Sequence, residues 1–330
     1  MKRESYSSFL IATPVVGVIC LATAIGQRAV LCGSPMPGLG SRSWNERTGT
    51  MVEQEEADPR EALADEGLLS PQVETWRHIY IDNYRDWFEL ARELNRYAVS
   101  LFQDHQDAGD GGPANAAAPT AVRVYGRALN AYTASIMLAE RAMTIEAVGA
   151  VRPIHEAGFW LSLLATNPEK ALEELDIDHH KHAVDREQLL RAAYPGNAEL
   201  HSASVQREAA HAALLGKRRP ISMKALAASL PGDPGYLQYR LASGFYGHLS
   251  QNSLDALKLR TGDKGVRPIL GPFETEIPKA LFFAIDAMAR TTRYFAALVK
   301  VRDANDILSA LRTTLTDLGK ADAEAGPQGG

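Results

Sequence analysis

Three polar side chains interrupt one of the most apolar stretches of the chain, VGAVRPIHEAGFWLSLLA at residues 148–165. Within it, Arg152, His155 and Glu156 are the only titratable residues. A guanidinium can stabilise an anion, and an imidazole or a carboxylate can transfer a proton. An isolated charge inside an apolar core is costly, so we expect Arg152 and Glu156, four residues apart, to pair on one helix face.

A second polar interruption is QYRLASGFYGHLSQNS at residues 238–253. It places Tyr239, Arg240, Ser243 and His248 among small residues. Glycine inside a helix costs about 1 kcal/mol relative to alanine, so we expect another helix or a ligand to approach closely at its two glycines. We expect both interruptions to meet in one buried polar junction, with His155, Tyr239, Arg240 and Ser243 around a pocket.

Two functions fit such a junction. In the first, the polar residues only hold helices in register, and the protein is a binding or regulatory module. In the second it is an RNase-like hydrolase, with His248 as general acid/base, Arg152 stabilising an anion and Glu156 orienting one of them. The chain contains no phosphate-binding glycine loop after a strand, no HExxH and no nucleophile elbow. We therefore favour the binding module and leave enzymatic activity open.

A histidine-rich run, DIDHHKHAVDRE at residues 176–187, has the residue types of a metal site. It contains His179, His180, His182, Asp176, Asp178 and Asp185. Asp178 and His182 are four residues apart and could share a helix face. However, the run offers neither apolar neighbours that would exclude water nor a recognisable outer shell that would orient the ligands. We therefore interpret it as a solvated helix face and expect no metal and no cofactor.

The remaining patterns predict an all-α, multi-helix bundle. Apolar residues spaced three and four apart run from Ser70-Pro71 to about Phe102 and again along 281–299. The stretch around 148–166 is apolar on nearly all sides, which is typical of a central helix. We thus expect two long heptad-patterned helices packed around a central apolar helix. No stretch alternates with period two over a useful length, so strands are essentially absent.

Several boundaries follow from proline and its neighbours. We expect Pro153 to kink or open its helix, and Asn167-Pro168 to end one helix and cap the next. Further helices are expected through about residue 194, over 198–215 and 222–230, and from Asp233-Pro234 to residue 250. A flexible linker is expected near 106–119 and a loop over 258–273.

The domain organisation comprises a leader at 1–50, one helical domain at 51–320 and a disordered tail at 321–330. Residues 9–26 are apolar and follow Lys2 and Arg3. One interpretation is a start at Met51, which predicts a cytoplasmic protein. The other is an export signal or membrane anchor, which predicts an exported or membrane-tethered helical protein.

Charge and cysteine content restrict the partners. The formal net charge is −5, and beyond residue 50 it is −8 because the first 50 residues carry five basic and two acidic residues. The one dense basic run, GKRRP at 216–220, is short, so broad nucleic-acid binding is disfavoured. Cys20 and Cys32 both lie in the leader, so the rest of the chain forms no disulfide or thiolate metal site. A homodimer is compatible with this composition.

Three features together resemble a known family: a long aromatic first helix, Arg152-x-x-x-Glu156 on an apolar helix, and Tyr239-x-x-x-Ser243 followed by His248. Over residues 70–310 the chain resembles a bacterial all-helical family catalogued as a domain of unknown function. That family is loosely similar to the HEPN superfamily, which includes many RNases of defence and toxin systems.

The resemblance implies a cytosolic helical bundle with no established activity, in keeping with a component of a defence system. The HEPN nuclease signature is an arginine and a histidine separated by four to six residues. Seven residues separate Arg240 from His248 and two separate Arg152 from His155, so the signature is not matched.

Overall fold

The computed structural model describes residues 67–106, 117–228, 230, 234–247, 254 and 271–325, together with the backbone of four short strands. His248, residues 107–116 of the expected linker, and the leader apart from the backbone of Arg42–Asn45 and Thr50 lie outside the described residues.

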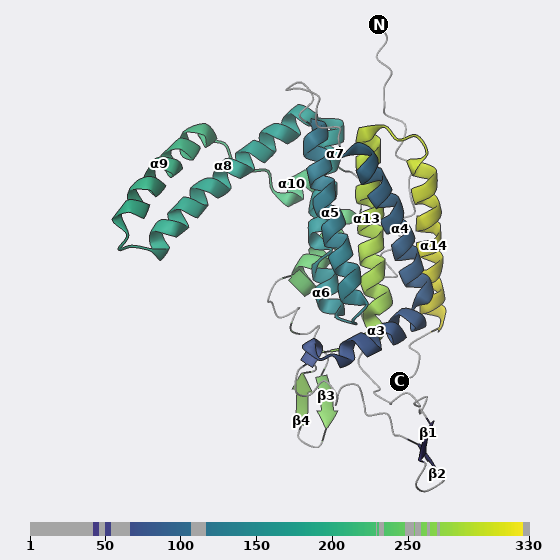
Figure 1. The fold of residues 1–330 in the computed structure, drawn as a ribbon. Coiled ribbons are helices and arrows are strands. Elements are labelled where there is room, and N and C mark those ends of the chain that lie inside the picture. Colours follow the sequence, from purple (N-terminus) through teal and green to yellow (C-terminus); the bar gives the residue numbers. More distant parts are fainter. Residues whose placement is uncertain are drawn as a thin grey trace.

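The described chain forms an all-α bundle, as predicted. Helix α13 (Ile277–Val299) lies in the middle, in contact with α5 (Ala117–Ala139) and α7 (Arg152–Thr166), while α4 (Arg85–His105) and α14 (Ala304–Ala325) cover its other side (Figure 1). Every residue of α13 from Phe283 to Thr292 is buried. The sequence predicted a single central helix at 148–166. In the structure α7 shares the central position with α13, because the long helix α13 is also buried on all sides.

The first long helix is divided in two, which differs from the expected continuous helix. Helix α3 (Gln72–Asn83) ends at Tyr84, whose backbone leaves the helical region at φ −117° and ψ 36°, and α4 begins at Arg85. Helix α3 crosses one end of the bundle (Figure 1). The apolar spacing continues through Tyr84, so the pattern alone could not reveal the break.

An ion-pair cluster holds α3 at that end. Glu140, just after α5, is buried and accepts hydrogen bonds from Arg77 on α3 and Arg92 on α4, with nearest nitrogen–oxygen distances of 2.7 and 3.1 Å. One carboxylate thereby joins three helices, and its burial is offset by two charged partners.

Two buried tyrosines connect α5 to its neighbours. The Tyr132 hydroxyl donates to the Ala91 carbonyl of α4 at 2.9 Å. The Tyr125 hydroxyl shares a 3.0 Å hydrogen bond with Thr292 of α13, and its ring stacks on Phe295 with centroids 4.1 Å apart. Burial raises the pKa of both phenols, so they remain neutral donors in the core.

The helix boundaries predicted from two prolines agree with the structure. Pro153 lies in the first turn of α7, after the break that follows α6 (Thr144–Gly149), so the expected opening is confirmed. Asn167 ends α7 and its side chain accepts a 3.2 Å hydrogen bond from the Lys170 amide at the start of α8 (Pro168–Ala193).

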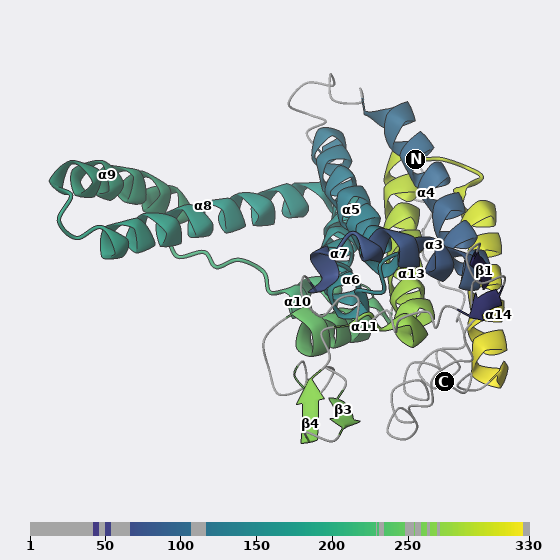
Figure 2. The same cartoon turned by 60° about the horizontal axis from the view of Figure 1, so that its bottom comes forward.

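A helical hairpin projects from the bundle. Helix α8 contacts α7 near its start and then packs antiparallel to α9 (Ala198–Leu215), which lies away from the bundle (Figures 1 and 2). We call residues 168–220 the arm. The chain returns through α10 (Met223–Ala227), which packs on α7, to α11 (Gly235–Leu241) and a π-helical stretch at Ala242–Gly247.

Short elements lie outside the bundle. A 3-10 turn (Gly67–Leu69) precedes α3 and another (Glu274–Glu276) precedes α13. Two antiparallel hairpins pair β1 (Arg42–Asn45) with β2 (Thr50–Glu53), and β3 (Leu259–Gly262) with β4 (Gly265–Pro268). Strands of four residues are too short to show a clear period of two, which is why the sequence gives no sign of them.

Two predicted boundaries, that of the linker and that of the C-terminal end of the helical domain, differ by a few residues from the structure. Helix α5 begins at Ala117, inside the expected linker, and α14 continues to Ala325, beyond the expected end at residue 320. Among the described residues, no helix combines the length and apolar character needed to cross a bilayer. The apolar stretch at 9–26 lies outside the described residues.

Candidate functional site

The two polar interruptions lie against each other where α7 meets α11. The Arg152 Nε donates to Glu156 Oε1 at 2.8 Å, which confirms the expected pair within α7. The same guanidinium lies over the ring of Tyr239 on α11, 5.6 Å from its centroid. A cation at this distance from a phenol face is attracted by the ring. Arg152 therefore links α7 to α11.

Burial differs from the expectation of a fully buried trio. The side chains of Arg152 and Glu156 are 32% and 29% exposed, whereas His155 is buried and its ring lies near Phe159. The reason is that α7 begins at Arg152, so the pair lies on the first turn rather than along the buried middle. Hydrogen bonding to Glu156 is the main cause that raises the pKa of Arg152, and the guanidinium stays charged.

The other residues of the second interruption are only partly buried. Ser243 is buried and Arg240 is exposed, so Arg240 is not part of a buried junction. At Gly247 an added Cβ would lie 3.3 Å from the Ala242 carbonyl oxygen, but at Gly244 it would meet no described atom within 4 Å. The Ala242 carbonyl belongs to the same π-helical stretch as Gly247, and the nearest atom of another helix is Arg152 Cδ of α7 at 4.0 Å, which is ordinary van der Waals contact. The distance from His248 to Arg152 is not tested, because His248 lies outside the described residues.

The described surface hollows do not coincide with the candidate catalytic residues. Two open hollows of about 590 Å³ are present, one at the base of the arm between α8 and the basic run, the other on α5 beside Pro153. Neither is lined by Arg152 or Glu156. What the described residues of the junction do show is a contact between α7 and α11 through Arg152.

Sequence reasoning missed a buried polar cluster on α13. Gln238 Nε2 donates to Asp286 Oδ2 at 2.8 Å, and Arg290 donates to both Asp286 and Gln238. All three side chains are buried. Asp286 and Arg290 are four residues apart in an apolar helix, the same signal that singled out Arg152 and Glu156, so it could have been found. The cluster ties α11 to α13 beside the junction.

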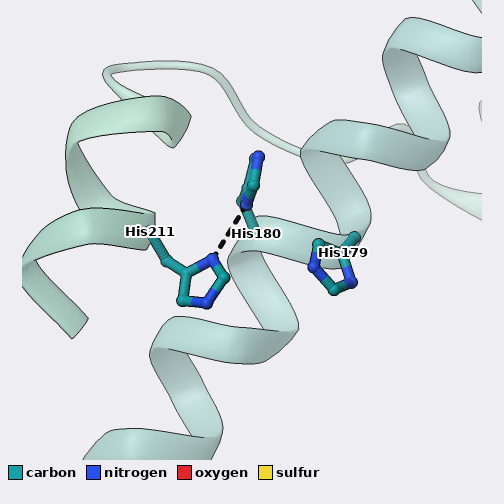
Figure 3. Close-up of side chains that lie close together, drawn as sticks. All are labelled: His179, His180 and His211. Carbon is teal, nitrogen blue, oxygen red and sulfur yellow. Dashed lines mark hydrogen bonds between the residues drawn. The ribbon is translucent and has the colours of Figure 1, made fainter. Parts of the chain in front are cut away.

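The arm brings three histidines together (Figure 3). His179 and His180 are consecutive on α8, and His211 comes from α9. One ring nitrogen of each lies within 4.8 Å of the others. The Nδ1 atoms of His180 and His211 are 3.0 Å apart. His182, the third histidine of the sequence run, instead points its Nε2 toward Asp178 at 3.5 Å and is exposed.

The histidine run is therefore not wholly a solvated face. His180 is buried between α8 and α9, His211 is half-buried and His179 is exposed. The Nε2 of His180 lies 3.4 Å from the Asp176 carboxylate, one turn earlier on α8. This contact orients the His180 ring and was not evident from the sequence. His211 was missed because it is 31 residues away from His180 and no local pattern marks it.

Polar contacts dominate the rest of the seam between α8 and α9. Glu187 is buried and bridges to Arg207 at 2.8 Å and to Arg186 at 3.1 Å. Ser204, also buried, donates to the Glu187 carbonyl at 2.9 Å. The hydrogen bond from Arg207 is the main cause that lowers the pKa of Glu187 to about 2. The arm is thus held by charge pairs as much as by apolar packing.

Comparison with known proteins gives no relative: no family model, no curated protein and no solved structure matches this chain.

Proposed function

We propose that the protein is a binding or regulatory module of the cytoplasm, in which the bundle is the scaffold and the arm is the contact element. The observation that carries this proposal is the projection of α8 and α9 away from the bundle (Figure 2). A pair of helices that buries only a few apolar side chains of its own gains stability when a further helical surface covers it.

The distribution of side chains on the arm supports a covered surface. Leu189, Val205 and Leu214 are 70%, 53% and 58% exposed, while charged and hydroxyl groups occupy the seam between the helices. Most of the other exposed side chains of the arm are polar, so these three are exposed apolar groups that a further surface can cover. Covering these side chains would release the water around them.

We propose a second copy of the chain as the occupant, because the charges permit it. The arm carries nine acidic and eight basic residues, whereas the rest of the chain beyond residue 50 has a net charge of −7. Two arms can approach without net repulsion, and their length keeps the acidic bundles apart.

The test is the oligomeric state of the full chain by analytical ultracentrifugation over a range of concentrations. We expect a reversible dimer that Leu189→Glu and Leu214→Glu convert to monomer. Met137→Glu on α5 is the matched control, since Met137 is 52% exposed on the bundle, and it should leave the dimer unchanged. A wild-type chain that stays monomeric at every concentration, or a dimer lost only in the control, contradicts the proposal.

A hydrolase is the second candidate, and the contact between Arg152 and Tyr239 favours it because it brings the two polar interruptions together. Against it, the Glu156 carboxylate is engaged with Arg152 on its own helix. The test compares growth of a bacterial host expressing wild type, His248→Ala or Glu156→Ala. Toxicity relieved by both variants would support the hydrolase, and equal growth in all three supports the binding module.

Membership of the helical family related to the HEPN superfamily remains part of the proposal. It would place the module in a regulatory or defence system. The all-α bundle is compatible with such membership, and the unmatched arginine–histidine spacing argues for a member without nuclease activity.

A further inference from the structure

We propose that His179, His180 and His211 form a binding site for a divalent transition-metal ion, with Zn²⁺ as the preferred ion. The site lies between α8 and α9 on the arm (Figure 3). This proposal does not depend on the arm being a contact surface, since the three ligands belong to one chain.

The ring positions suit a tetrahedral ion. Zinc binds imidazole nitrogen at about 2.0–2.1 Å, which places two tetrahedral ligands roughly 3.4 Å apart and their ring centres roughly 5 Å apart. The observed ring centroids are 5.2 Å apart for His179 and His180, 5.2 Å for His180 and His211, and 5.7 Å for His179 and His211. The triangle needs only small ring rotations to direct one nitrogen of each residue to a common point.

One pair of ligand atoms already converges. The Nδ1 atoms of His180 and His211 are 3.0 Å apart, so both lone pairs face the same small space. Without a metal, one of the two must carry a proton and donate it to the other. A metal ion replaces that proton and adds the nitrogen of His179. Because His179 is exposed, its ring can turn without disturbing the seam.

The outer shell fixes the required tautomer. Ligating histidines usually donate their second ring N–H to a carboxylate, which orients the ring and makes it a better ligand. The Nε2 of His180 lies 3.4 Å from Asp176 Oδ1, so a proton on Nε2 is stabilised and Nδ1 is left as the ligand atom. Asp176 also supplies negative charge close to the ion.

The nearest lysine on the same turn does not oppose a cation. Lys181 is paired with Asp185 on α8. Three neutral nitrogen ligands without a thiolate select Zn²⁺, Cu²⁺, Ni²⁺ or Co²⁺ over Ca²⁺ and Mg²⁺, which prefer oxygen. Three protein ligands leave one position for water. The site thus fits a nitrogen-coordinated transition metal.

The experiment uses the full chain without an affinity tag, freed of metal with a chelator. Co²⁺ is titrated while its visible absorption is recorded, and Zn²⁺ is then added in competition. We expect one Co²⁺ per chain with tetrahedral absorption, displaced by Zn²⁺. We expect His179→Gln, His180→Gln and His211→Gln each to weaken Zn²⁺ binding at least tenfold, by the effect of losing one ligand.

Two controls keep the test specific. His182→Gln removes an exposed histidine two residues from His180 and should leave the affinity unchanged. Cys20→Ser with Cys32→Ser removes the thiolates and should also leave it unchanged. His179→Gln is the decisive variant because its exposed ring can be replaced without loss of packing, and circular dichroism confirms that each variant folds.

Clear outcomes would overturn the proposal. These are the absence of saturable Zn²⁺ binding to the wild type, unchanged affinity in His179→Gln and His211→Gln, or loss of binding in the cysteine or His182→Gln controls alone. A site that prefers Mg²⁺ or Ca²⁺ would also contradict it.

Discussion

The bundle and the arm are built from the same kind of helix, yet they are held together by different forces. Around α13 the bundle buries apolar side chains from five other helices, α4, α5, α6, α7 and α14. Along the arm, α8 and α9 meet through Glu187, Arg207, Ser204 and paired histidines. Apolar burial is not screened by ions and does not depend on protonation, while ion pairs are screened by salt and both ion pairs and imidazoles respond to pH. The bundle is therefore a stable scaffold, and the arm is the part that solution conditions can change.

The stability of the two regions should differ as a consequence. Half-exposed ion pairs contribute about 0–1 kcal/mol each, whereas a fully buried leucine contributes about 1.5–3 kcal/mol. Amide hydrogen exchange should therefore show local opening of the arm at lower free energy than global unfolding of the bundle.

The largest loss of stability is expected from a cavity made in the core by truncating a side chain of α13. Leu281 is fully buried, so Leu281→Ala should lower the free energy of unfolding by about 2–5 kcal/mol, measured by urea denaturation. Tyr194→Ala on the arm, where the side chain is 57% exposed and is not part of the proposed dimer contact, is the control and should change it by less than about 0.5 kcal/mol. Similar losses in both variants would remove the distinction between the regions.

Metal ions should act on the arm alone. At a free Zn²⁺ concentration of about 100 times the dissociation constant, binding stabilises the bound form by about 2.7 kcal/mol. Hydrogen exchange with and without Zn²⁺ should show slower exchange in α8 and α9 and unchanged exchange in α13. Equal protection of both regions would mean that the ion binds elsewhere.

The contact of α7 with α13 offers a test of bundle rigidity. A Cβ added at Gly158 would lie 2.8 Å from Thr291 Oγ1, too close for van der Waals contact. Gly158→Ala should destabilise the bundle by about 1–3 kcal/mol, as seen in thermal unfolding. Adding Thr291→Ala should recover part of the loss. Gly196→Ala, where no described atom lies within 4 Å, should be nearly neutral.

The smallest effect should be the acid response of the arm. The pKa of Glu187 is lowered to about 2, so its stabilising ion pairs are complete above the ordinary range of a glutamate and are lost as the pH falls toward 2. The protection factors of the α8 and α9 amides, which correct for the slower intrinsic exchange in acid, should fall as the pH is lowered in the wild type. Glu187→Gln should open more readily at neutral pH and lose most of the further acid dependence, and an unchanged profile would show that Glu187 is not responsible.

Local chemistry was readable from the sequence where partners are close along the chain. The pair of Arg152 and Glu156 follows from a spacing of one helical turn, and the boundary at Asn167 follows from a capping residue before proline. The break at Tyr84 was not readable, because the apolar spacing continues through it. The exposure of Arg152 depends on where α7 begins, which the pattern did not fix.

Contacts between distant segments account for the rest. His211 joins His180 across the α8–α9 turn, and Gln238 reaches Asp286 on a helix 48 residues later. Neither follows from periodicity. A signal for the arm did exist, since five of the nine histidines fall within residues 168–220. That composition indicates a helix pair outside an apolar core.

The chain leaves the bundle for the arm and returns to it at neighbouring points. The arm leaves α7 at Asn167, and the Ile221 amide is fixed by a 3.2 Å hydrogen bond to Glu174, near the start of α8. Helix α10 then packs on α7 again. Exit and re-entry are neighbours, so the arm has the topology of an insertion. The entropy of closing such a loop grows only slowly with its length, and the segment could be lengthened, shortened or exchanged while the bundle continued to fold.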